Sequence, residues 1–277
     1  MLDAYRTTTA IYAALGLASG LDAQIILGNK GVLELRTGHL RAAATLLEGA
    51  SVRERELAGD SAAVAAALGY YGRVLSLFRR DSQALAVLRG AVDMASRYAG
   101  AWSPVALQNS LFLGEAELLR GDSATARAAL ERLHAVALMQ YGPAHVLTLR
   151  GELALASGDG AAARRNLPAI VAGLRRLGPS AEANLAEALQ LLGEAQPLDA
   201  PNAEAPAALR EALMLRTRSS TAGYGVALVR ERLGEALAAR KDTGARALLS
   251  QALSDLRSEL GPDHPEVGRA QCALASL

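Results

Sequence analysis

Apolar residues recur at helical spacing along most of this chain, in blocks that repeat every 37 to 42 residues. The third block is representative. Residues 111–120 carry apolar side chains at helical spacing, Gly121 and Asp122 interrupt them, and a second helical pattern runs from Thr125 to about Gln140. Asp122 or Ser123 is suited to cap the second helix. Each block therefore predicts two antiparallel helices joined by a tight turn.

The register of the blocks is set by an alanine that is followed four residues later by a leucine. The six pairs are Ala43/Leu47, Ala84/Leu88, Ala126/Leu130, Ala163/Leu167, Ala205/Leu209 and Ala245/Leu249, with alanine spacings of 41, 42, 37, 42 and 40 residues. Glycines run in step about twelve residues earlier, at Gly31, Gly72, Gly114, Gly151, Gly193 and Gly234. A period of this length, held over six blocks, indicates a stacked repeat array rather than one globular core.

The small residues predict close helix packing. A glycine inside a helix costs about 1 kcal/mol relative to alanine, so six glycines in register require a compensating gain. We expect the alanine of the second helix to face this glycine, and the leucine to fill the core between neighbouring pairs. Between blocks the sequence turns through Gly142-Pro143, Gly178-Pro179 and Gly261-Pro262. There glycine should supply a left-handed cap and proline the first turn of the next helix.

Composition supports an all-α protein and argues against catalysis. Hydrophobic residues make up 51% of the chain but aromatic residues only 4%, so the apolar content is mainly Ala, Leu and Val, and the net charge is +1. That balance gives no reason to expect nucleic-acid or membrane binding. Cys272 is the only cysteine, and the histidines (His39, His134, His145 and His264) lie far apart in the sequence. We expect no metal site, no cofactor, no membrane insertion and no enzymatic activity.

These residues resemble the tetratricopeptide repeat, with Gly at the eighth position, Gly-Asp at the turn and Ala at the twentieth. The 41–42-residue spacing and the run Leu-Gly-Pro-Asp-His-Pro-Glu at 260–266 resemble its long, 42-residue variant, found in kinesin light chain. Similar arrays are attached to bacterial serine/threonine kinases and signalling ATPases. The resemblance covers about residues 22–277 and implies a right-handed superhelical solenoid of about six antiparallel helix pairs. The family's large aromatic positions are mostly Ala, Val or Leu here.

The register divides the chain into a flanking helix, six pairs and part of a seventh unit. Residues 1–20 are the flanking N-terminal helix, and the pairs within 21–261 fall at about 21–58, 60–98, 101–140, 143–177, 179–217 and 219–260. In the fifth pair, Pro197 and Pro201 should end the first helix early. Residues 262–277 form the first helix of an incomplete seventh unit, which indicates a fragment, a trimmed terminus or a partner over the last face.

In the family, first helices line a concave groove, and the residue after the repeated glycine projects into it. That residue is Val32, Arg73, Glu115, Glu152, Glu194 and Glu235 in this chain. By the same register, flanking groove positions hold Glu231, Glu187, Gln190, Gln108 and Thr148. The four glutamates predict a negative stripe, with Arg36 and Arg73 at an opposite, basic end. The alternative is a solvated helix position at which glutamate is simply a good helix former.

The resemblance implies a non-enzymatic protein–protein interaction module, used for scaffolding, docking or sensing in a bacterial signalling protein. The glutamate row would bind an extended basic segment of a partner through charge-assisted contacts. The expected compartment is the cytoplasm, or the periplasm if the array is the C-terminal arm of a membrane-anchored kinase. Two alternatives stay open: a small-molecule-sensing domain of a transcriptional regulator or kinase, and self-association through the C-terminal unit.

Overall fold

The computed structural model describes residues 2–157, 160–196, 204–220 and 222–277, and within them every regular element is a helix. The chain divides into two compact units, Met1–Val136 and Ala137–Leu277, and the boundary between them falls within the helix Ser123–Tyr141. In chain order the helices are α1 (Leu2–Ala14), α2 (Leu21–Thr37), α3 (Leu40–Ala58), α4 (Ala62–Leu77), α5 (Asp81–Ala99), α6 (Pro104–Arg120), α7 (Ser123–Tyr141), α8 (Val146–Ser157), α9 (Gly160–Arg176), the 3₁₀ helix η1 (Gly178–Ala181), α10 (Glu182–Ala195), α11 (Glu204–Ser219), α12 (Tyr224–Ala238), α13 (Ala245–Leu260) and α14 (Pro265–Ala275).

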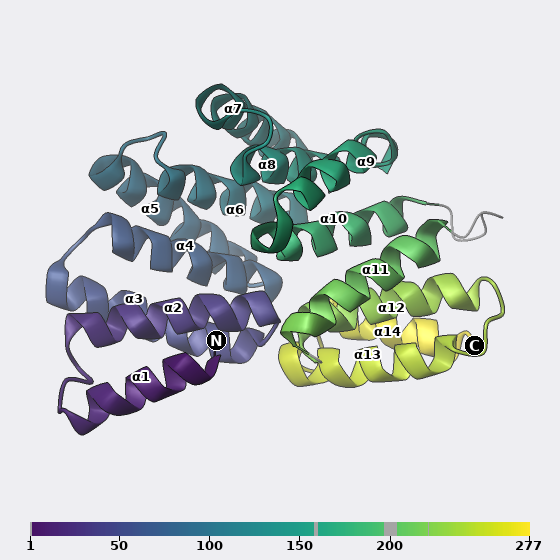
Figure 1. The fold of residues 1–277 in the computed structure, drawn as a ribbon, viewed down its shortest axis with the longest axis horizontal. Helices are drawn as coiled ribbons and strands as arrows, with labels where there is room; N and C mark the ends of the chain where they lie inside the picture. Colours follow the sequence, from purple (N-terminus) through teal and green to yellow (C-terminus); the bar gives the residue numbers. More distant parts are fainter. Residues whose placement is uncertain (1, 158–159, 197–203, 221) are drawn as a thin grey trace. The chain divides into compact units, whose positions relative to one another are not determined.

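Helices pack against their neighbours in the chain, as Figure 1 shows within each unit. In the first unit α2 packs on α3 and α4 on α5. In the second, α8 packs on α9, α10 on α11 and α12 on α13, and α14 follows against α13. We call α2, α4, α6, α8, α10, α12 and α14 the first helices, and α3, α5, α7, α9, α11 and α13 the second helices. The predicted fold class, an all-α helical solenoid, is confirmed.

A leucine of the second helix lies over a glycine of the first helix in at least five pairs. A methyl group added at Gly72 would lie 2.6 Å from Leu88 Cγ, and one at Gly193 would lie 2.6 Å from Leu209 Cγ. The same contact joins Gly31 to Leu47, Gly114 to Leu130 and Gly234 to Leu249. These distances are shorter than the non-bonded contacts that side-chain carbons make in proteins, so only glycine leaves room for the leucine.

This contact corrects one detail of the sequence interpretation. The alanine was expected to face the glycine and the leucine to fill the space between pairs. Instead the leucine occupies the space left by the absent glycine side chain, which we call the glycine notch. The alanine contributes through its backbone instead. Its carbonyl oxygen comes close to the glycine, 3.2 Å from the position of an added methyl at Gly193 for Ala205 and 3.4 Å at Gly234 for Ala245.

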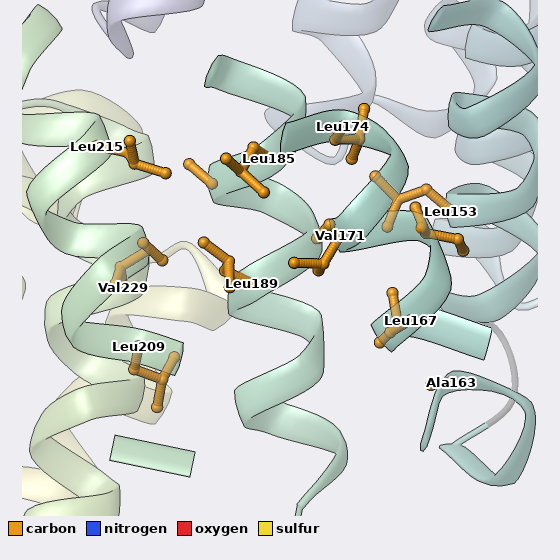
Figure 2. Close-up of a cluster of buried hydrophobic side chains, with 14 of the residues drawn as sticks. Leu153, Ala163, Leu167, Val171, Leu174, Leu185, Leu189, Leu209, Leu215 and Val229 are labelled. Atoms are coloured by element: carbon orange, nitrogen blue, oxygen red, sulfur yellow. The ribbon is translucent and has the colours of Figure 1, made fainter. Parts of the chain in front are cut away.

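The repeated alanines and leucines form the core. All six alanines are at most 5% exposed and all six leucines at most 1%; Leu47, Leu88, Leu167 and Leu249 are wholly inaccessible. Figure 2 shows the resulting cluster in the second unit, where side chains from α8 to α12 meet. Leu167, Leu189 and Leu209 lie in one continuous apolar layer there. Burying such side chains contributes roughly 1.5–3 kcal/mol each, the main term that stabilises the array.

The turns between pairs agree with the glycine prediction and correct the proline one. Gly142, Gly178 and Gly261 have φ values of +80°, +67° and +93°, which favour glycine, although Gly261, with ψ 162°, ends α13 outside the left-handed helical conformation. Pro143 and Pro262, however, lie in turns, since α8 begins at Val146 and α14 at Pro265. Each of these two prolines is followed by further turn residues before the helix starts. Residues 197–203, where an irregular turn was expected after α10, lie outside the described residues.

A buried asparagine fixes the packing of α4, α5 and α6 within the first unit. Asn109 is 1% exposed, and its Nδ2 donates to Ala65 O at 2.9 Å and Ala91 O at 3.2 Å. Its Oδ1 occupies the space beside Gly69, where a methyl group would lie only 1.9 Å away. One side chain thus joins three helices through backbone contacts.

We predict that Gly72→Ala destabilises the first unit by about 1–3 kcal/mol, because the new methyl collides with Leu88. Gly90→Ala is the matched control. Gly90 is an exposed residue of α5 with nothing within 4 Å of an added methyl, so alanine there should stabilise by about 0.5–1 kcal/mol. Urea unfolding followed by circular dichroism measures both changes. Equal changes in the free energy of unfolding in the two variants would contradict the packing of Leu88 into the glycine notch.

Candidate functional site

The first helices present the residues that the repeat register selected. Glu115 lies on α6, Glu152 on α8, Glu194 on α10 and Glu235 on α12. First helices of successive pairs contact one another directly, as α4 does α6 and α10 does α12, whereas contacts between successive second helices are sparse among the described residues. The first helices therefore form the closely packed side of each unit, and we call their solvent-facing surface the first-helix face.

In the first unit the face brings Arg73 and Glu115 together as an ion pair between α4 and α6. The side chains are 21% and 20% exposed, so water screens the pair only in part. The Arg73 guanidinium also lies over the Phe112 ring, 4.9 Å from its centroid, and Tyr70 meets that ring edge-on at 5.2 Å. These contacts hold Arg73 in place through its charge and through the ring face.

In the second unit Arg232 lies between two of the predicted glutamates. Its Nε is 3.1 Å from Glu194 Oε1 across α10 and α12, and its Nη1 is 2.9 Å from Glu235 Oε2 on its own helix. Gln190 donates from Nε2 to Glu194 at 3.0 Å. Burial acts to lower the pKa of Arg232, but the carboxylates of Glu194 and Glu235 outweigh it and raise the pKa. One guanidinium therefore serves two carboxylates.

A second arginine continues this arrangement from α12 to α14. Arg269 binds Glu231 through both ends of the carboxylate, with Nε–Oε1 at 3.0 Å and Nη2–Oε2 at 3.2 Å, and it also pairs with Glu266. The Glu231 side chain is wholly inaccessible, and burial raises its pKa although Arg269 acts to lower it. Glu231 was predicted as a groove residue, but its carboxylate is enclosed by its own chain and is not offered to a partner.

Gln190 and Thr148 also turn inward rather than into a groove. Gln190 is 9% exposed, and its Oε1 accepts from Arg216 Nη2 at 3.2 Å. Burial lowers the pKa of Arg216, while Glu187 acts to raise it, which places that predicted residue beside the guanidinium. Thr148 is wholly buried and donates to Gly142 O at 2.8 Å. These polar groups satisfy hydrogen bonds inside the second unit.

The other predicted residues occupy more open positions. Arg36 is exposed at the end of α2, and Gln108 and Glu152 are partly buried on α6 and α8. At least three of the four glutamates in the row thus have an arginine partner, so the row is neither a bare negative stripe nor a fully solvated position. Whether this set binds a partner stays a prediction.

The arginines Arg232 and Arg269 were missed by reading single positions, although a signal for them exists. Each ion pair joins residues about one repeat apart, with separations of 42 residues for Arg73 and Glu115 and 38 for both Glu194–Arg232 and Glu231–Arg269. A search for opposite charges one period apart would have found them, because successive first helices are in contact.

Charge is unevenly shared between the two sides of the second unit. Its first helices hold seven carboxylates and four arginines, namely Glu152, Glu182, Glu187, Glu194, Glu231, Glu235 and Glu266 against Arg150, Arg230, Arg232 and Arg269. Its second helices hold nine arginines and four carboxylates, namely Arg164, Arg165, Arg175, Arg176, Arg210, Arg216, Arg218, Arg246 and Arg257 against Glu204, Glu211, Asp255 and Glu259. The first helices of the second unit therefore carry an excess of acidic residues, and its second helices an excess of basic ones.

Within the described part of the chain, no three His, Cys, Asp or Glu side chains gather as they would around a metal ion. The described helices include none with the length and apolar content needed to cross a membrane.

Comparison with known proteins adds little. No protein-family model and no curated protein sequence matches the chain. A similar solved structure is a circular tandem repeat protein with novel repeat topology and enhanced subunit contact surfaces. It is 16% identical and aligns over 99% of this chain and 75% of that chain, with a TM-score of 0.26. A likeness this distant carries no weight for fold or function, so the fold rests on the chain's own helices.

We predict that Arg269→Met destabilises the second unit by about 3 kcal/mol, because it leaves the buried Glu231 carboxylate without its partner. This is the lower end of the usual cost, since Arg269 itself is 39% exposed and water reaches part of the pair. Arg175→Met is the control. Its pair with Glu211 is at the surface and should contribute at most about 1 kcal/mol.

Urea unfolding of both variants measures the difference. Adding Glu231→Gln to Arg269→Met should recover much of the loss, because a neutral amide costs less to bury than a carboxylate. If the double variant is no more stable than Arg269→Met, the buried charge is not the cause.

Glu54 on α3 gives a prediction about pH. It is 4% exposed, its Oε1 lies 3.2 Å from the position of a methyl at Gly28, and it has no hydrogen bond or ion pair within the described ranges. Burial raises its pKa above the ordinary 4.5. The folded form therefore holds this proton more tightly, so the contribution of Glu54 to stability falls as pH rises from about 4.5 through the folded-state pKa.

Glu54→Gln should therefore be more stable than the natural protein near neutral pH and equal to it near pH 4.5, as read from urea unfolding at both values. Glu56→Gln, at an exposed position two residues on, controls for general charge effects. A gain from Glu54→Gln that is independent of pH would contradict this account.

Proposed function

We propose that this chain is a non-enzymatic protein-interaction module that binds a basic segment of a partner protein on the first-helix face of its second unit. Helical repeat arrays generally mediate protein–protein interaction, and they do so through surfaces that successive repeats build side by side. An extended segment lying across α8, α10 and α12 would meet Glu152, Glu194 and Glu235 in turn.

The observation that carries the proposal is the unequal pairing at Arg232. One guanidinium serves both Glu194 and Glu235, whose side chains remain 27% and 22% exposed. Each carboxylate has about four acceptor positions, so acceptors remain for a Lys or Arg of a partner. Such charge-assisted bonds are roughly twice as strong as neutral ones, and the acidic excess of the first helices would favour the encounter.

The wider setting follows from the resemblance to the long tetratricopeptide repeat. On that ground we assign the chain to a bacterial signalling protein, as a docking or sensory arm like those attached to serine/threonine kinases, acting in the cytoplasm. The repeat residues support this setting.

The test compares fluorescent peptides that differ only in charge, one rich in Arg and Lys and one in which Glu and Asp replace them. The basic peptide should bind and the acidic one should not, and affinity should fall as salt is raised because the contacts are partly exposed. The double variant Glu194→Gln with Glu235→Gln should weaken binding several-fold, as measured by fluorescence anisotropy.

The matched control is Glu56→Gln with Glu131→Gln, which removes the same charge from exposed positions on α3 and α7. This variant should bind the basic peptide as the natural protein does. Equal weakening in both double variants would mean a general charge effect, and the first-helix face would not be the site.

A further inference from the structure

Four first helices begin with a side chain that accepts a hydrogen bond from the helix backbone. Ser61 Oγ accepts from Val64 N at the start of α4, and Ser103 Oγ accepts from Ala106 N at the start of α6, both at 3.2 Å. The other two acceptors are histidines, both in the second unit. The first helices α2, α10 and α12 have no such side-chain cap.

The two histidine caps share one geometry. His145 Nδ1 accepts from Leu147 N at 3.3 Å before α8, and His264 Nδ1 accepts from Glu266 N at 3.2 Å before α14. In both, the acceptor is two residues before the donor. Each turn also opens on a glycine with a positive φ, Gly142 at +80° or Gly261 at +93°. The same histidine cap therefore occurs in two separate turns.

The geometry assigns a tautomer and with it a sensitivity to protons. An Nδ1 that accepts a bond from a backbone N–H carries no proton, so this contact requires a neutral imidazole with its proton on Nε2. Histidine changes charge between about pH 5 and pH 8. A proton on Nδ1 replaces an acceptor by a donor facing the N–H, and it sets a positive charge at the positive end of the helix.

We propose that His145 and His264 are proton-sensitive caps. Mild acidification then frays the first turns of α8 and α14, while the first turns of the serine-capped α4 and α6 stay intact. Fraying at the start of α8 would disturb the first-helix face. Thr148, which donates to Gly142 O, lies in the first turn of α8, and Glu152 lies one helical turn further on. Fraying at the start of α14 would disturb Arg269, which binds the buried Glu231.

The charged and titratable neighbours differ between the two caps. From α7, the Tyr141 ring stacks on His145 with centroids 4.6 Å apart and planes at 26°, and the first charged residue along α8 is Arg150. Around His264 the sequence places Glu259 at the end of α13, Asp263 in the turn and Glu266 on α14, and Arg269 of α14 binds both Glu266 and Glu231 of α12. Glu266 favours a positive imidazole, but its carboxylate is bound by Arg269.

The test is amide hydrogen exchange, followed by NMR on the full chain between about pH 8 and pH 5 and corrected for intrinsic exchange. The Leu147 and Glu266 amides should lose protection several-fold on acidification, whereas the Val64 and Ala106 amides should not. In His145→Asn with His264→Asn the loss should vanish, because asparagine caps a helix at any pH in this range. Circular dichroism checks that this variant folds.

Three results would overturn the proposal. Protection lost equally at Val64 and Ala106 would mean global acid unfolding, and a loss that persists in the asparagine variant would exclude the histidines. Long-range ¹H–¹⁵N spectra that place the neutral proton on Nδ1 would exclude the caps themselves. The sign also separates this effect from buried Glu54 and Glu231, whose raised pKa values make the fold more stable as pH falls.

Discussion

The contact between a leucine of the second helix and a glycine of the first is the constraint on which the rest of this structure depends. Without a side chain at Gly72 or Gly193, the two helices of a pair approach until the leucine fills the notch. The gain is the burial of a whole leucine at each pair, which offsets the cost of a glycine inside a helix. Repeated at a near-constant period in the five pairs where it is seen, the contact gives these pairs a similar spacing, so that neighbouring pairs can stack.

The spacing of the pairs also decides where charges meet. Because the first helices of successive pairs contact one another, residues about one repeat apart in the sequence become neighbours in space. Arg73 meets Glu115 in this way, and Arg232 meets Glu194. The result is a face that is largely self-paired, on which Glu194 and Glu235 of the second unit share one arginine and remain partly exposed. Such a surface remains compatible with water while retaining acceptors for a basic partner.

The ends of the helices follow more local rules. Glycines with positive φ follow the second helices at Gly142 and Gly261, because glycine adopts such conformations with the least strain. The following helix then begins where a side chain accepts its first free N–H, which is at His145 and His264 and not at the preceding prolines. Capping chemistry therefore varies along the array while the core contact stays the same, and it gives different pairs different responses to their surroundings.

The sequence by itself determined the all-α class, the repeat and its register, since these follow from helical periodicity and from the spacing of Ala, Leu and Gly. It also placed Glu115, Glu152, Glu194 and Glu235 at equivalent positions of four successive first helices. Only the tertiary structure decided that leucine, not alanine, fills the glycine notch, and that Arg232 joins two of those glutamates. It alone showed Glu231 buried beneath Arg269 and Asn109 joining three helices. The physical reason is that periodicity fixes which face of a helix a residue occupies, whereas its partner and its burial depend on the distance between helices, which no single helix encodes.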